Sequence, residues 1–443
     1  MDSTQREALA KRAVARSNAD QVEVRVSTSD EALTRFTHGI SNQNVASHNM
    51  SVAVRAIIDG RTGVAASNDC SEASIDALLA RAEQMASFAP KDPQQPLLPS
   101  GGATVTPAGS YAAGTAAAAP ELRARFCDTI MSRAEALGFW TSGYAATSSG
   151  GTTIANSSGA LASFDGTGAQ VNAKATAPDS TGFAEQCAND VSVLDGEAVG
   201  ARAVELARAS AKPRAVEPGD WTVILDPPAF GELFAYLAGH FSAQSFADGS
   251  SFCSGALDTS FFDESVNVMD DYAHPLAPSM PFDFEAQPKL RVPLVTAGVV
   301  RGIVTDSYYA SKLGRENTGH ALPAPNAWGP QPLNLVIGAG TKSRDQLIAE
   351  TKRGLLISRF WYIRTVDQKR AIVTGMTRDG TFLIANGAIT GGVRNMRFNQ
   401  SIVEAPKHVE FAAEQRRTGQ YSYSLVVPTA KLAKFTFTST TEF

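Results

Sequence analysis

The chain has few cysteines and few histidines for its 443 residues. Its four cysteines lie far apart and form no CxxC pair, so the sequence indicates neither a disulfide framework nor a thiolate zinc cluster, and we expect a reducing compartment. Its six histidines include no HExxH motif, and no two of them are three to five residues apart. Because a catalytic zinc ion ordinarily has three protein ligands, a zinc site made by this chain alone is not indicated.

Strong positive charge and long hydrophobic runs are also missing. Lys and Arg number 39 against 44 Asp and Glu, which gives a formal net charge of −5 and lacks the basic footprint of a dedicated nucleic-acid-binding protein. No apolar run approaches the roughly 18 residues of a membrane span, and Ser3–Ser17 has the pattern of a polar amphipathic helix rather than a signal peptide. We therefore expect a cytoplasmic protein with no membrane partner and no nucleic-acid partner.

What the first half does contain is a succession of alternating apolar and polar residues, typical of half-buried strands. In Gln21–Ser27 the valines 22, 24 and 26 share one face, and Asp59-Gly60 is a hairpin turn signal. Helices are predicted over Ser71–Ala86, Glu121–Leu137 and Gly196–Ala211. The predicted strands, broken by Gly and Ser, are Gln21–Ser27, Ala32–His38, Ser51–Ile58, Arg61–Ala66, Phe139–Ser148, Gly151–Asn156, Ala160–Asp165 and Ala169–Ala177.

Proline and glycine divide the chain. Residues 89–120 are rich in Pro, Gly and Ala and are predicted to form a long loop or linker. Residues 213–219 interrupt a helix before the buried strand Trp221–Leu225, so we place a domain boundary there. The length is compatible with two or three domains, and this pattern favours two, over residues 1–212 and 221–443. The second is predicted to be rich in strands, with hairpin turns at 379–380 and 386–387.

One helix of the second half carries candidate chemistry. Glu232, Tyr236 and His240 fall at i, i+4 and i+8 of a helix predicted over 228–245, and so share one face. The outer two are about 12 Å apart along that axis, which excludes a shared metal ion unless the helix breaks. Tyr308 and Lys312 form a YxxxK pair, but no dinucleotide-binding motif precedes them, and we interpret the pair as helix packing.

A basic and aromatic segment remains open to two interpretations. It interleaves three aromatic residues with basic ones, an arrangement that would suit stacking on single-stranded nucleic acid. The same alternation is typical of an amphipathic strand, which is the interpretation we favour. The residues are Lys352, Arg353, Arg359, Phe360, Trp361, Tyr362, Arg364, Lys369 and Arg370.

Four segments in fixed order make the chain recognisable. The most specific blocks are TDSYYASKLG followed by TGHA, and DGTFLIANGAITGGV. Together the segments resemble the TldD/PmbA family of heterodimeric metallopeptidases, and the likeness covers essentially the whole chain. The resemblance implies an α+β fold with an N-terminal domain of helices on a curved, mainly antiparallel sheet, and a C-terminal β-rich metallopeptidase-like domain. The segments are 59–69, 237–252, 292–321 and 376–398.

The family has two subunit types, and this chain departs from the metal-binding one. The TldD-type subunit carries HExxxH on a helix and a further cysteine ligand near its C-terminus. Alignment on Gly239-His240 places Ala235 at the first histidine and Tyr236 at the glutamate, and no cysteine follows Cys253. Alanine can neither hold a metal nor activate water. The sequence is therefore similar to the TldE/PmbA-type subunit, which lacks the zinc motif.

The resemblance implies a heterodimer with a TldD-type subunit, in which the partner holds zinc and this chain holds no cofactor. The two would enclose a cavity in which unfolded or modified peptides, or a peptide-like natural product, are hydrolysed. His240, His320, Asn326 and Trp328 are the predicted cavity or interface residues. The substrate stays open between general peptide turnover, peptide-antibiotic maturation and a natural-product pathway.

Two alternatives to that function are kept. One is a stand-alone peptide-binding or adaptor protein that captures peptides without hydrolysing them. The other is a hydrolase with an unrelated site built on Glu232, Tyr236 and His240.

Overall fold

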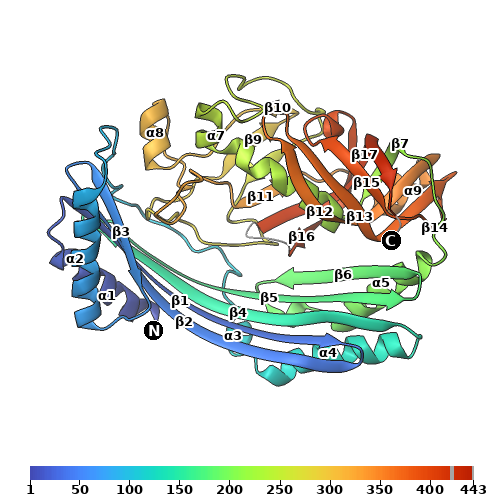
Figure 1. The fold of residues 1–443 in the computed structure, drawn as a ribbon, viewed down its shortest axis with the longest axis horizontal. Helices are drawn as coiled ribbons and strands as arrows, with labels where there is room; N and C mark the ends of the chain where they lie inside the picture. The colour runs from blue at the N-terminus through green and yellow to red at the C-terminus, as the bar shows by residue number, and fades with distance from the viewer. Residues whose placement is uncertain (420–423, 442–443) are drawn as a thin grey trace.

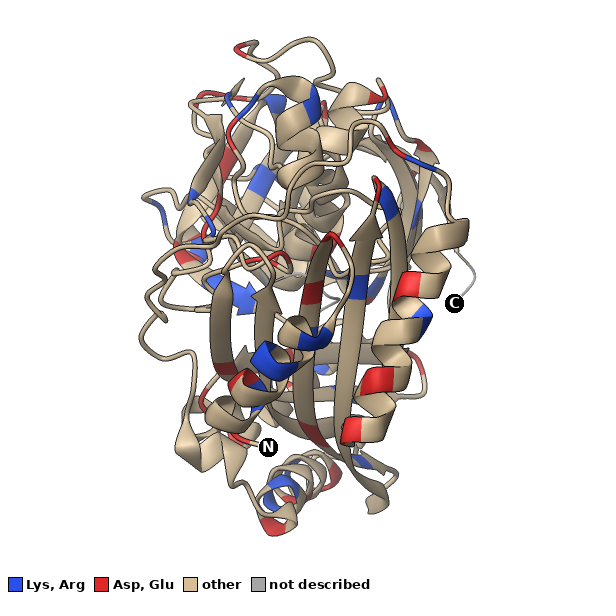
Figure 2. Ribbon diagram, turned by 90° about the vertical axis from the view of Figure 1, so that its left-hand side faces the viewer, with Lys and Arg blue, Asp and Glu red and all other residues tan. Residues whose placement is uncertain are grey.

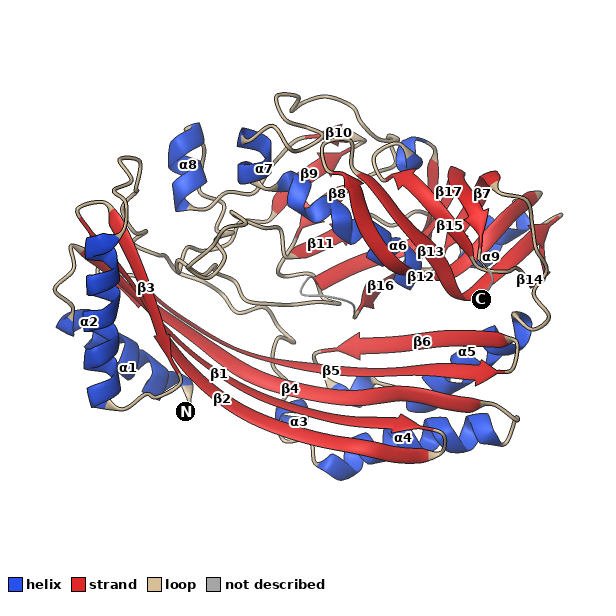
Figure 3. Cartoon of the chain, viewed as in Figure 1, coloured by secondary structure: helices blue, strands red, loops and turns tan. Residues whose placement is uncertain are grey.

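A computed structural model describes residues 1–419 and 424–441. A long curved sheet from the first half of the chain lies below the β-rich second half in Figure 1, and Figure 3 shows that its helices line its outer, convex side. The predicted α+β class, with helices on a curved antiparallel sheet followed by a β-rich domain, is confirmed. Within the described residues no helix is long and apolar enough to cross a membrane.

The N-terminal sheet is antiparallel throughout, in the order β3-β2-β1-β4-β5-β6. The separate short strands predicted on each side of Gly166–Gly168 are wrong, because β5 pairs with β4 through that stretch. The separate short strands predicted on each side of Thr28–Glu31 and of Gly150 are also wrong, because β1 and β4 continue through both places. The flanking strands pair with these residues on both sides and so extend the ladder through weak strand formers. The strands are β1 (Gln21–Thr37), β2 (Ile40–Ile58), β3 (Arg61–Ser67), β4 (Trp140–Asn156), β5 (Leu161–Ala177) and β6 (Ser180–Ala188).

The convex face of this sheet is apolar and covered by helices. The predicted alternation is confirmed in β1, where Val22, Val24 and Val26 are buried and pack with Leu9 of α1 and Ile75 of α2. The Asp59-Gly60 turn is confirmed, since both residues have a positive φ. The helices are α1 (Ser3–Arg16), α2 (Glu72–Phe88), the short α3 (Ala113–Ala116), α4 (Pro120–Glu135) and α5 (Gly196–Ala209), with a 3₁₀ turn at Val191–Val193.

The N-terminal half is built as a structural duplication. A helix, three antiparallel strands and a second helix occur as α1-β1-β2-β3-α2 and again as α4-β4-β5-β6-α5, and the two halves meet at the β1–β4 pair. A Cβ added to Gly63 of β3 would lie 2.1 Å from the carbonyl oxygen of Ala82 in α2. A Cβ added to Gly182 of β6 would lie 2.2 Å from the carbonyl oxygen of Ala203 in α5. Each half therefore uses a glycine to bring its last strand against its last helix.

The second half forms a mixed sheet with two parallel pairs, β11–β17 and β12–β7. The path runs β10-β9-β8-β11-β17-β15-β13-β12-β7, and β14 and β16 pair with β13 and β17. Its strands are β7 (Gly219–Leu225), β8 (Val268–Asp270), β9 (Val292–Thr296), β10 (Val299–Val300), β11 (Asn334–Ile337), β12 (Arg353–Asp367), β13 (Ile372–Ala385), β14 (Ala388–Gly392), β15 (Met396–Ser401), β16 (Val409–Thr418) and β17 (Ser424–Thr440). Its helices are α6 (Pro227–Phe234), α7 (Ala243–Ala247), α8 (Ser307–Leu313) and α9 (Arg344–Ala349), with 3₁₀ segments η2 (Ala235–Phe241) and η3 (Ala405–Lys407).

Several local predictions for the second half have clear outcomes. The buried strand at Trp221 is confirmed as β7, and the basic and aromatic segment is strand β12. Asn386-Gly387 does turn the chain between β13 and β14. The hairpin predicted at Asp379-Gly380 is wrong: both residues have a positive φ but form an irregularity within β13. Buried Asp379 there forms ion pairs with Lys174 of β5 and Arg359 of β12.

The junction between the two halves follows α5. That helix ends at Ala209 and β7 begins at Gly219. Residues 89–112 contain neither helix nor strand, but the loop predicted over 89–120 is wrong at its end, where α3 follows at once and Pro120 begins α4, a position at which a helix tolerates proline. The division at 212 and 221 stays a prediction. Residues 420–423 and 442–443 of the predicted second domain lie outside the described residues.

Candidate functional site

The segment that carries the degenerate motif is not one helix. The α-helix predicted over 228–245 is wrong beyond Phe234: α6 ends there, η2 continues as a 3₁₀ helix, and α7 begins at Ala243. A 3₁₀ helix has about three residues per turn, so Glu232, Tyr236 and His240 do not follow the 3.6-residue spacing that placed them on one face. The segment packs into the core through Leu237, Ala238 and Phe241.

His240 is held inside this core. It is only 2% exposed, its Nδ1 accepts a hydrogen bond from the Phe252 N–H at 3.4 Å, and its ring lies 5.3 Å from the Phe252 ring. Burial lowers the pKa of His240 to about 4, so the imidazole is neutral near pH 7. The Tyr236 hydroxyl donates to the Ile363 carbonyl oxygen at 2.6 Å. Both polar side chains of the degenerate motif are therefore engaged within the chain.

These residues do not fit the zinc ion that the family implies. Across residues 1–419 and 424–441 no group of three or more His, Cys, Asp or Glu side chains is placed to hold a metal. Ala235 has no donor atom, and His240 receives a backbone N–H at Nδ1 in an aromatic environment. That this chain binds no metal stays a prediction.

His320 belongs to a buried polar network. It is 2% exposed, its Nε2 lies 3.1 Å from Oδ1 of Asp270, and its Nδ1 lies 2.9 Å from Oγ1 of Thr318. The backbone N–H of Asn334 donates to Asp270, and Lys289 donates to the Asn334 side chain. Burial alone would raise the pKa of Asp270, but the charge and hydrogen bond of His320 hold it below its usual range. The network ties β8 to the segment before β11.

Asn326 and Trp328 lie together on a surface turn. The Asn326 side chain accepts from the Trp328 N–H at 2.8 Å and donates to the Gly329 carbonyl oxygen at 3.0 Å. Trp328 is 76% exposed. The structure thus separates the four predicted residues into two buried histidines and two turn residues, and their role at a cavity or interface stays a prediction.

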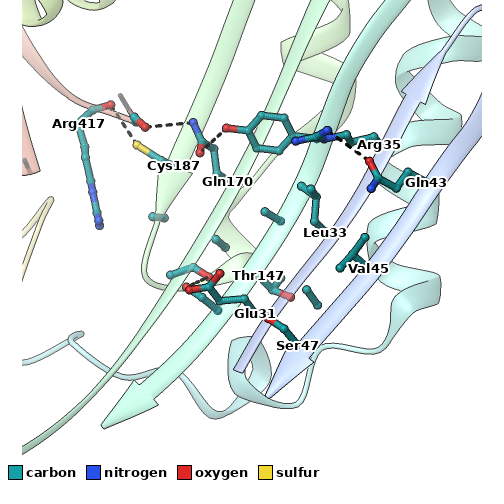
Figure 4. A pocket seen from close by; sticks show the side chains of 18 of the residues that line it. Glu31, Leu33, Arg35, Gln43, Val45, Ser47, Thr147, Gln170, Cys187 and Arg417 are labelled. Carbon is teal, nitrogen blue, oxygen red and sulfur yellow. Dashed lines mark hydrogen bonds between the residues drawn. The ribbon is translucent and has the colours of Figure 1, made fainter. Parts of the chain in front are cut away.

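A hollow that the sequence did not reveal lies on the concave face of the N-terminal sheet. This concave trough has a volume of about 800 Å³, and Figure 4 shows side chains of β1, β2, β4, β5 and β6 along it with Arg417 of β16 at one end. Its floor mixes polar and apolar side chains. Among the polar ones, the Tyr144 hydroxyl donates to Gln170 at 2.9 Å, and Arg35 donates to Gln43 at 3.3 Å. Burial raises the pKa of the Cys187 thiol to about 12, which keeps it protonated and unreactive. The trough can hold a polar chain but presents no activated nucleophile at this thiol.

A second hollow lies where the two halves of the chain meet. We name it the junction cavity; its volume is about 610 Å³. One wall is formed by β2, β3 and the end of α2. The opposite wall is formed by α8 and residues 321–329. Its polar and aromatic lining includes Arg55, Asp92, Gln244, Glu285, Asp306 and Tyr309. Asn326 lines it too, so one predicted residue faces a cavity. Local sequence patterns could not find it, because its walls come from distant segments.

Charged residues of both signs lie on the side of the molecule that Figure 2 draws. Figure 2 shows acidic and basic residues mixed along the helices and loops of this side, in line with the small net charge. The aromatic side chains of β12 contact arginines: Arg378 lies over Trp361 at 4.7 Å and Arg364 over Tyr362 at 4.3 Å.

Two family models match parts of this chain. The model of the PmbA/TldA metallopeptidase C-terminal domain matches residues 218–439, about half of the chain, and that of PmbA/TldA metallopeptidase domain 1 matches residues 22–86. No curated protein matches the chain.

Solved structures agree over nearly the full length. TldE from Thermococcus kodakarensis has a TM-score of 0.90 at 20% identity, covering 98% of this chain and 99% of that one. A proposed modulator of a DNA gyrase from Thermotoga maritima has a TM-score of 0.88 at 18% identity, covering 98% and 100%. A proposed modulator of DNA gyrase from Bacteroides thetaiotaomicron has a TM-score of 0.85 at 17% identity, covering 99% of this chain and 100% of that one. These similarities establish a shared fold, and with the match over residues 218–439 they show that the chain belongs to the PmbA/TldA metallopeptidase family, the TldD/PmbA family that its sequence resembles.

Proposed function

We propose that this chain is the TldE/PmbA-type, metal-free subunit of a heterodimeric zinc metallopeptidase. It shapes the cavity in which a TldD-type partner hydrolyses unfolded or modified peptides, or a peptide-like natural product. The observation that carries the proposal is the degenerate motif: Ala235 and Tyr236 stand where a ligand and a base would be needed, and His240 is buried and neutral. The proposal includes a cytoplasmic location and the division into domains 1–212 and 221–443.

The concave trough supports a role in holding peptides. An extended peptide needs hydrogen-bonding groups along its length, and the trough presents polar side chains from neighbouring strands. Its volume, about 800 Å³, lies within the roughly 300–1,000 Å³ typical of ligand pockets. Because the trough lies in one chain, it also favours the second candidate, a stand-alone protein that captures peptides without hydrolysis.

An open strand edge supports a protein partner. Residues 40–51 of β2 pair only with β1 among the described residues, and Ile40–Asn49 are exposed. This stretch has no Asp, Glu, Lys, Arg or Pro, the residues that natural sheets use to block edge-to-edge pairing. We propose that the TldD-type subunit covers this edge. Val45→Lys should then reduce co-purification with the partner, whereas Val193→Lys, on an exposed 3₁₀ turn elsewhere, should not.

Co-expression with a TldD-type subunit tests the main proposal. We expect the two chains to co-purify, with about one zinc per heterodimer by metal analysis, and to degrade denatured fluorescent casein. The isolated chain should contain no stoichiometric zinc and leave the casein intact. Zinc retained by the isolated chain together with casein cleavage would refute the proposal. Casein binding by the isolated chain, with no complex formed, would favour the adaptor.

A rebuilt motif gives a sharper test of the metal-free state. Ala235→His with Tyr236→Glu restores the residue types of HExxxH. In a 3₁₀ helix, however, positions 235 and 240 are about 10 Å apart along the axis, against about 7.5 Å in an α-helix. We expect the double variant to bind no more zinc than the wild type in equilibrium dialysis. Stoichiometric zinc in it would show that the residue types alone decide metal binding.

A further inference from the structure

We propose that the junction cavity binds a guanidinium or alkylammonium group presented by a peptide. The choice of a peptide rests on the proposed function, whereas the choice of a cation rests on the lining of the cavity alone. Four charged side chains line it, and three of them, Asp92, Glu285 and Asp306, are carboxylates. The single guanidinium, Arg55, is already paired with Glu23 at 2.8 Å and with Glu285 at 3.1 Å. The excess charge in the cavity is therefore negative.

Asp306 points to a ligand more specifically than the charge excess does. It is only 8% exposed and lines the cavity. One oxygen, Oδ1, accepts from the Tyr309 N–H at 2.8 Å and caps α8, and among the described residues its other oxygen has no hydrogen-bond partner. Because Asp306 lines the cavity, a cation with N–H groups held there can donate to this second oxygen.

The remaining lining suits a donor with a positive charge. The side-chain oxygen of Gln244 also has no hydrogen-bond partner within the described part of the chain, so a second acceptor is free on the wall. Tyr308 and Tyr309 line the cavity next to Asp306. The ammonium of Lys312, on the same helix, lies 5.9 and 5.4 Å from the centroids of these two rings. Burial raises the pKa of Tyr309 to about 12, so its hydroxyl stays neutral.

The size of the cavity matches a side chain rather than a metal ion. A volume of about 610 Å³ admits an arginine or lysine side chain with part of its backbone. Gln244 follows His240 by four residues, across the start of α7. The cavity thus lies beside the segment that corresponds to the zinc-binding motif of the other subunit type.

Isothermal titration calorimetry of the isolated chain tests the inference. The probes are acetyl-Ala-Arg-Ala-amide, its citrulline analogue, which has the same shape without the charge, and free agmatine. We expect the arginine peptide to bind at least tenfold more tightly than the citrulline peptide. Agmatine binding as tightly as the peptide would identify a small free cation as the ligand while supporting the site. Equal affinity for the arginine and citrulline peptides, or no binding at millimolar concentration, would overturn the inference.

Variants locate the binding. Asp306→Asn removes the charge but keeps an N-cap residue of equal quality, so α8 should remain folded. We expect this variant to bind the arginine peptide at least fivefold more weakly than the wild type and to bind the citrulline peptide with unchanged affinity. Asp92→Asn is a second variant that does not touch a helix cap, and Asp345→Asn, on the exposed surface of α9, is the matched control. An Asp306→Asn chain that binds the arginine peptide as the wild type does would refute the assignment.

This test is separable from the proposed function. The titration uses the chain without its partner, so failure to bind a cation would leave the two-subunit peptidase standing. Failure of the heterodimer to form or to hydrolyse casein would equally leave the binding result standing.

Discussion

The ion pairs of Arg55 make the strongest prediction about how the two halves of the chain are held together. Arg55 of β2 donates to Glu23 of β1 at 2.8 Å and to Glu285 of the second half at 3.1 Å. The three side chains are only 13%, 7% and 10% exposed. Arg55→Met would keep most of the side-chain volume but leave two buried carboxylates without their cation. Removing one partner of a buried ion pair costs about 3–5 kcal/mol, and we expect a loss of this size at pH 8.

The pH dependence of the loss distinguishes an electrostatic cause from a packing cause. Burial already raises the pKa of Glu23, although the charge of Arg55 opposes the rise. Burial, and then the charge of Glu285, raises the pKa of Asp283 to about 8. A carboxyl whose folded pKa is raised contributes stability at low pH and loses it as the pH rises through that pKa. Without Arg55 the pKa of Glu23 should rise further, so the destabilisation should shrink as the pH falls from 8 to 5.

Urea unfolding followed by tryptophan fluorescence at pH 8 and pH 5 measures both effects. Arg301→Met is the matched control, because its ion pair with Asp258 is largely exposed and should be worth no more than about 1 kcal/mol. Adding Glu285→Gln to Arg55→Met should recover part of the loss at pH 8 by removing one uncompensated charge. The reasoning is refuted if Arg55→Met costs less than about 1 kcal/mol at pH 8, or if its cost is the same at both pH values.

Three further variants test packing and burial. Gly63→Ala should destabilise by about 1–3 kcal/mol in urea unfolding, since its Cβ would lie 2.1 Å from a backbone oxygen of α2, whereas Gly114→Ala, with open space around it, should be neutral or stabilising. Phe398→Ala should cost about 3–5 kcal/mol, because the buried ring packs 4.8 Å from Phe360; a smaller loss would mean that the core collapses around the cavity. His240 should contribute a loss of up to about 3 kcal/mol as the pH falls from 6.5 towards 4, since the unfolded chain then protonates it and the folded chain does not, so His240→Gln should lose less stability than the wild type over this range.

Much of the fold could be predicted because the patterns that specify it are local. The alternation of Val22, Val24 and Val26 requires a strand with one buried face whatever surrounds it. The limits of the strands could not be predicted from such patterns. Position 151 of β4 is glycine, a weak strand former, because a Cβ there would lie about 2.3 Å from the guanidinium of Arg6. Arg6 is buried against Asp165 on the neighbouring strand. The glycine is thus required by a contact from α1, far earlier in the chain, that no local pattern contains.

The candidate sites divide in the same way. The missing ligands at Ala235 and Tyr236 are facts of the sequence, and so is the family resemblance on which their meaning depends. Only the tertiary structure decided that the segment breaks into a 3₁₀ helix, that His240 and His320 are buried, and that Asp306 and Arg55 line one cavity. The physical reason is range: residue types and periodicity are fixed by neighbours along the chain, whereas burial, charge pairing and cavities depend on segments that only folding brings together.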